Sequence, residues 1–124
     1  MAGEVWTLPA KVLQVVDGDT IEIAYNLGFN LGRTGRGRLR GVNTAEVFGV
    51  DPRSAAAADG KKQSAFTADW CAHGLRGFDG NWPFLVSCFG FDKYGRDLVE
   101  ITRRLDGAEL RTALVEAFPL VRIG

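Results

Sequence analysis

The sequence predicts a mixed α+β domain that is mainly β: a five-stranded Greek-key barrel of the OB type with two helices, in the order β-β-β-α-β-β-α. Three observations predict it. The first half has the alternation and turn dipeptides of consecutive hairpins. A helical segment then separates these strands from two more. The 124 residues suffice for a single hydrophobic core, so residues 1–124 are expected to form one domain.

Three strands are predicted in the first half, over residues 7–16, 20–25 and 38–43. Valine-rich and alternating segments favour strands, and the Asp-Gly dipeptide at residues 17–18 is a strong tight-turn signal. Residues 26–37 are glycine-rich and polar, and we expect them to form a long hairpin loop.

A helix is predicted over residues 59–72, capped by Asp59 and stopped by Gly74. Two strands follow, over residues 82–91 and 96–104, with a turn between them. The first is apolar on both faces, which predicts full burial. The second helix is predicted from a capping pair, an apolar stripe and a stop: Asp106 with Glu109, then Leu110, Leu114 and Phe118, then Pro119.

Charge limits the possible functions. Fifteen basic residues balance fifteen acidic residues, which disfavours a protein that coats nucleic acid through a general basic field. Phosphate recognition must therefore come from local clusters. One cluster holds four arginines within eight residues: Arg33, Arg36, Arg38 and Arg40.

The sequence also bears on the localisation of the protein and on the redox state of its cysteines. No apolar run approaches the roughly 20 residues of a membrane span, so no membrane partner is expected. The amino terminus lacks the pattern of a secretory signal, which predicts a cytoplasmic protein. Two cysteines cannot build a disulfide framework. Cys71 and Cys88 are expected to be free core thiols, with a single disulfide as the alternative.

Several residues have side chains suited to phosphate chemistry with a metal ion. Asp19 and Asn43 offer hard oxygen ligands for a divalent cation, and Glu46 offers a carboxylate that can accept a proton from water. Arg38 and Arg96 offer planar forks for a phosphate. Each motif alone is more often a solvated turn or strand. For Arg38 and Asn43 to converge, the chain must bend near the intervening glycine.

Taken together, four ordered stretches resemble the staphylococcal nuclease family: VVDGDTIEI, RLRGVNTAE, QSAFTADW and FDKYGRDLVEI, followed by the helical ALVEAF. The resemblance extends over residues 12–118, and four blocks in the expected order are far more specific than any one motif. It implies an OB-fold nuclease that hydrolyses phosphodiester bonds of DNA and/or RNA with Ca²⁺.

The resemblance also implies residue roles. The metal ligands would be Asp19, Asn43 and the carbonyl of Thr44. The catalytic residues would be Arg38, Glu46 and Arg96, with Glu46 as general base and the two arginines as phosphate clamps. The substrate-binding residues would be Lys93 and Tyr94.

The sequence departs from the family pattern in four places. One is the loop over residues 26–37, which looks longer than usual and is basic, so it is expected to contact the nucleic-acid backbone. Asn43 stands where the family has an aspartate, which removes a charge from the metal site. Ala45 stands where a proline is usual. The family's final helix has no counterpart before Gly124, so a homodimer partner is expected to cover the barrel surface. Two alternatives to a nuclease stay open: a nucleic-acid-binding module that has lost metal chemistry, and a protein-interaction module of the same fold.

Overall fold

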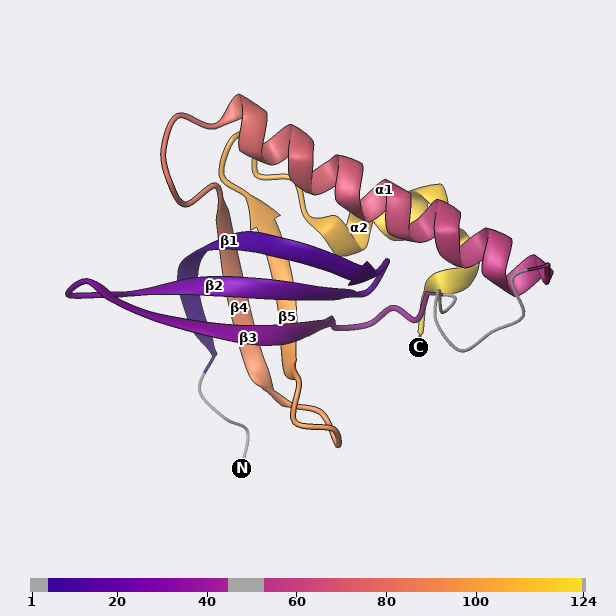
Figure 1. Ribbon diagram of the computed structural model, residues 1–124, viewed down its shortest axis with the longest axis horizontal. Helices are drawn as coiled ribbons and strands as arrows, with labels where there is room; N and C mark the ends of the chain where they lie inside the picture. The colour runs from indigo at the N-terminus through magenta and orange to yellow at the C-terminus, as the bar shows by residue number, and fades with distance from the viewer. Residues whose placement is uncertain (1–4, 45–52, 124) are drawn as a thin grey trace.

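Five strands close into a barrel with the hydrogen-bonded order β1-β2-β3-β5-β4 (Figure 1). The computed structural model describes residues 5–44 and 53–123. Neighbouring strands pair antiparallel, except that β3 and β5 run parallel. This arrangement is that of an OB barrel, so the predicted fold class is confirmed. The strand bounds are β1 Trp6–Asp17, β2 Thr20–Gly28, β3 Leu31–Leu39, β4 Phe84–Phe91 and β5 Asp97–Arg103.

Two helices lie on the same side of the barrel (Figure 1). They are α1 (Ala55–Gly77) and α2 (Leu110–Ala117), and a short 3₁₀ turn follows α2. Trp70 of α1 is buried and stacks on Phe84 of β4 with 5.7 Å between ring centroids. These rings join α1 to the barrel interior, where the apolar faces of the strands meet. In the described part of the chain, neither helix has the length and apolar character needed to cross a membrane.

The predicted loop over residues 26–37 is wrong. Strand β2 continues to Gly28 and β3 begins at Leu31, so the turn between them has two residues. The third strand also ends at Leu39 rather than at residue 43. The reason is that β3 pairs with β5 only from Gly37 onward, so its first half has no buried face. Without a buried face, the sequence shows no apolar alternation from which a strand can be predicted.

The first helix is longer than predicted at both ends. It begins after Ser54, whose Oγ accepts a hydrogen bond from the backbone N–H of Ala57 at 3.1 Å, and it continues through Gly74. A side chain at Gly74 would lie 2.9 Å from the ring of Phe84 and from Arg103. This glycine therefore allows the helix to approach the barrel closely and does not stop it.

Two smaller predictions are also corrected. Strand β4 is not buried throughout, because Leu85 and Phe91 are exposed to solvent. The capping pair before α2 does not form either, since Glu109 occupies the cap position and its side chain makes no hydrogen bond that caps the helix backbone. Asp106 instead accepts from the N–H of Ala108 and pairs with Arg103. Both cysteines are free, as expected.

A Gly74→Ala substitution tests the close approach of α1. Alanine favours helix over glycine by about 1 kcal/mol, but here its methyl group must displace the Phe84 ring. We expect a net loss of about 1–3 kcal/mol in the free energy of unfolding, measured by urea titration. In the control Gly77→Ala, the methyl group meets only the end of the exposed Leu105 side chain, which can move. A Gly74→Ala protein as stable as the control would contradict this packing.

Candidate phosphate and metal site

Asp19 lies in the turn between β1 and β2 and is buried, with 7% of its surface exposed. Its Oδ1 accepts a hydrogen bond from the Thr20 hydroxyl at 2.9 Å, and its Oδ2 accepts from the backbone N–H of Thr44 at 2.9 Å. Arg38 Nη1 forms an ion pair with Oδ2 at 3.1 Å. Buried carboxylates require such partners. Asp19 is therefore not a solvent-exposed residue of an ordinary hairpin turn.

Arg38 joins the two halves of the site. Its Nη1 donates to the carbonyl oxygens of Leu39 and Val42 at 2.8 and 2.7 Å, and its Nη2 donates to Asn43 Oδ1 at 3.2 Å. These bonds are possible because the chain bends after β3, where Gly41 has a φ of +81°. The bend expected at this glycine is confirmed, and it brings Arg38 and Asn43 together.

Thr44 packs against the turn that carries Asp19. It is buried, and among the described residues its hydroxyl oxygen has no hydrogen-bond partner. Its methyl group packs against Gly18, where a Cβ would be only 2.9 Å away. The carbonyl of Gly18 in turn accepts from the Thr67 hydroxyl of α1 at 2.6 Å. The turn, the bend and the helix thus hold one another in place around Asp19.

Arg96 reaches the same region from the position directly before β5. Parallel pairing of Arg38 with Leu98 brings the two arginines to one open hollow of about 280 Å³, which we call the basic hollow. Its described lining includes four cationic side chains and one carboxylate, that of Asp92. The side chains of the basic hollow that matter here are Arg38, Arg40, Asp92, Lys93, Tyr94 and Arg96.

Asp92 fixes the position of Arg96, a role that the sequence did not reveal. Its Oδ2 accepts from Arg96 Nε at 2.6 Å, and its Oδ1 accepts from the backbone N–H groups of Tyr94 and Arg96 at 2.9 Å. Desolvation opposes ionisation, but these hydrogen bonds outweigh it and lower the pKa of Asp92. The signal in the sequence was the aspartate that opens the DKYG turn, where such residues bond to the backbone.

Lys93 and Tyr94 lie on the rim of the basic hollow. Tyr94 is 71% exposed, and the ring lies 5.1 Å from Lys93 Nζ and 5.3 Å from the Arg96 guanidinium. An exposed ring beside two cations is suited to stacking on a base next to a bound phosphate.

The four-arginine cluster does not act as one patch. Arg33 forms a bidentate pair with Asp97 at 2.8 and 3.0 Å, and Arg36 pairs with Glu22 at 2.8 Å. The Arg40 guanidinium lies 4.3 Å from the centre of the Phe89 ring. Only Arg38 of the four contacts the Asp19 carboxylate in the described structure.

The oxygen atoms of the predicted metal ligands are of the chemical type that binds calcium. The carboxylate of Asp19, the amide oxygen of Asn43 and the backbone carbonyl expected of Thr44 are hard oxygen donors, which Ca²⁺ prefers. In the described part of the chain, no group of three or more His, Cys, Asp or Glu side chains is placed to hold a metal ion. Glu46, the expected general base, lies outside the described residues, as does Ala45. A cation at Asp19 would share its carboxylate with Arg38.

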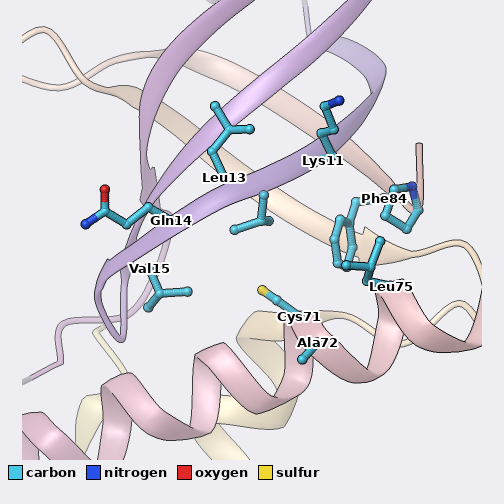
Figure 2. A pocket seen from close by; sticks show the side chains of 10 residues that line it. Lys11, Leu13, Gln14, Val15, Cys71, Ala72, Leu75 and Phe84 are labelled. Atoms are coloured by element: carbon cyan, nitrogen blue, oxygen red, sulfur yellow. The ribbon is translucent and has the colours of Figure 1, made fainter. Parts of the chain in front are cut away.

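A second hollow, between α1 and β1, differs in chemistry (Figure 2). Its lining is mostly apolar and includes Leu13, Val15 and Leu75. Cys71 points into it from α1, and burial raises the pKa of this thiol to about 12. The thiol therefore stays protonated at neutral pH and is a poor nucleophile. Of these two hollows, the basic hollow is the one suited to an anion.

The comparisons with known proteins do not identify the chain. No protein-family model matches the sequence, and no curated protein matches it.

The contacts of Arg38 predict a structural contribution as well as a functional one. Arg38→Lys removes the donors to the Leu39 and Val42 carbonyls and to Asn43. We expect a loss of about 1–3 kcal/mol in the free energy of unfolding, measured by urea titration. The control Arg40→Lys changes an exposed arginine on the same segment and should alter stability by less than about 0.5 kcal/mol. Equal losses would mean that the bonds of Arg38 do not stabilise the bend.

Proposed function

We propose that this protein is a calcium-dependent nuclease that hydrolyses phosphodiester bonds of single-stranded DNA and/or RNA. The observation that supports the proposal most is the basic hollow, where Arg38 of β3 and Arg96, which directly precedes β5, line one space beside a buried carboxylate. Ordered stretches that resemble the staphylococcal nuclease family support it independently.

The arginines are suited to the charge that develops during hydrolysis. Attack on a phosphodiester builds negative charge on the phosphate oxygens, and fixed cations in a site stabilise that charge. Arg96 is held by Asp92 through Nε, and its terminal nitrogens carry further donors. Arg38 is held by two backbone carbonyls, so both guanidinium groups are oriented before substrate arrives. In the proposal, Arg96 also assists departure of the leaving oxygen.

Asp19, Asn43 and Thr44 would hold the calcium ion. When bound, calcium supplies positive charge next to the phosphate and a site for the attacking water. Glu46 would accept a proton from that water. Lys93 and Tyr94 would bind the neighbouring nucleotide at the rim of the basic hollow.

A binding module is the second candidate. The Asp19 carboxylate is already paired with Arg38, and the neutral Asn43 contributes no charge toward a cation. A module that binds phosphate without cleaving it needs only the arginines and Tyr94. Calcium-dependent cleavage separates the two candidates directly.

The first test is cleavage itself. Purified protein should cut single-stranded DNA or RNA in millimolar calcium and stop when the metal is chelated. Arg96→Lys should lower turnover by about 100-fold, because lysine keeps the charge but loses the planar fork. Arg76→Lys, on the exposed end of α1, is the matched control and should leave turnover unchanged. A folded protein that binds the oligonucleotide without cutting it would favour the binding module.

The second test concerns the metal. Asn43→Asp should tighten calcium binding several-fold in a calorimetric titration, because a carboxylate replaces a neutral amide at the proposed ligand. Arg38 Nη2 would remain a partner for the new carboxylate, so the bend should persist. Equal affinity in the two proteins would remove Asn43 from the metal site.

A further inference from the structure

The β2–β3 hairpin extends away from the barrel (Figure 1). Its turn contains an aromatic residue with a positive φ, Phe29. Its two turn residues, Phe29 and Asn30, have φ values of +54° and +60°. Two-residue turns of this sign favour glycine, asparagine or aspartate, and a bulky residue there is an outlier. Phe29 is also 97% exposed, so its ring gains nothing from packing in this chain. Strain of this kind concentrates at functional positions.

A cavity of about 480 Å³ opens beside this turn. Phe29 and Trp82 supply two aromatic rings, and Asn26 and Asn30 supply two side-chain amides. Asn26 Oδ1 accepts from the N–H of Gly28 at 2.9 Å, while Lys11 Nζ lies 5.1 Å from the Trp82 ring. Aromatic rings stack on bases, and amides form hydrogen bonds with base edges. The cavity is thus suited to an unpaired nucleobase.

A polar face of β3 connects this cavity with the basic hollow. Thr34, Arg36 and Arg38 alternate along the strand and share one face. Arg36 retains half of its side-chain surface exposed while it pairs with Glu22. At about 3.3 Å per residue, the strand between Gly32 and Arg38 spans about 20 Å. A single-stranded nucleic acid bound to an OB fold contacts it over at least about four nucleotides. One extended nucleic-acid strand can therefore reach both the cavity at the hairpin and the basic hollow.

We infer that the hairpin tip is a second nucleic-acid subsite, which takes an unpaired base several nucleotides from the phosphate in the basic hollow. The inference rests on the proposed function, because it assumes that the basic hollow holds a phosphate of the same strand. It makes the substrate an extended single strand rather than a mononucleotide or a duplex. Phe29 binds this distant base and is not a catalytic residue.

Oligonucleotide length separates the two sites. Fluorescence anisotropy with labelled (dT)3 and (dT)8, in EDTA to prevent cleavage, measures binding to the wild-type protein and to Phe29→Asn. Loss of one stacked base should weaken (dT)8 binding by about 5- to 100-fold, whereas (dT)3 binding should stay within about twofold. Asparagine tolerates positive φ, so the melting temperature should not fall. Phe29→Tyr should keep (dT)8 affinity close to that of the wild type.

The control Leu120→Asn removes another fully exposed apolar side chain, distant from the hairpin in sequence. It should bind both oligonucleotides as the wild type does. Equal weakening of (dT)3 and (dT)8 by Phe29→Asn, or no weakening of either, would overturn the inference. So would a wild-type dimer in sedimentation that Phe29→Asn dissociates without changing (dT)8 affinity, because the ring would then serve self-association.

Cleavage assays with calcium distinguish failure of the subsite from failure of the proposed function. If (dT)8 binding depends on Phe29 but no cleavage occurs, the subsite stands and the proposed catalysis fails. If (dT)8 is cleaved and its binding and cleavage do not depend on Phe29, the subsite fails and the catalysis stands.

Discussion

The ion pair between Asp19 and Arg38 is the constraint on which the candidate site depends. A carboxylate with 7% of its surface exposed is stable only when its charge is compensated. Here the compensation comes from a guanidinium and from the backbone of Thr44, on the far side of the chain's bend. Removing either partner would leave a buried charge. The turn after β1 and the bend after β3 must therefore form together.

The same constraint would limit binding of the proposed metal ion. The oxygens that would ligand a cation already accept hydrogen bonds from Thr20, Thr44 and Arg38. A cation at Asp19 competes electrostatically with the guanidinium, and a negative phosphate between the two cations would relieve their repulsion. Metal and substrate are therefore expected to bind more tightly together than alone. With a neutral Asn43, this dependence on substrate becomes stronger, since less protein charge offsets the metal.

The sequence predicted those parts of the fold that bury apolar side chains. Ile21, Ile23 and Tyr25 alternate on β2 and are all buried. The two helices were predicted from apolar residues at helical spacing. The first half of β3, before its pairing with β5 begins at Gly37, has no buried face. Its sequence therefore shows no apolar alternation from which a strand could be predicted. For Arg38 and Asn43 to converge, the chain had to bend near the glycine between them, and the structure has that bend. The role of Glu46 remains a prediction.

In the first half of β3, an ion pair between Arg33 and Asp97 takes the place of apolar packing. Asp97 at the start of β5 is 1% exposed, and it accepts hydrogen bonds from the Tyr25 hydroxyl at 2.8 Å and from both terminal nitrogens of Arg33. Burial and the bond to Asp97 raise the pKa of Tyr25, so its hydroxyl stays a donor. Gly35 makes room for this cluster, since a Cβ there would lie 2.7 Å from Asp97 Oδ2.

This cluster links the two ends of β3. Asp97 pairs with Gly37 in the parallel ladder, directly before Arg38, while Arg33 lies toward the hairpin tip. The arginine and glycine residues that looked like a basic loop therefore align the strand against β5. That alignment brings Arg38 beside Arg96 at one end and supports the exposed turn at the other. A segment predicted from its composition to be a long hairpin loop is mostly strand in the folded protein, and this strand sets the spacing between the two proposed binding positions.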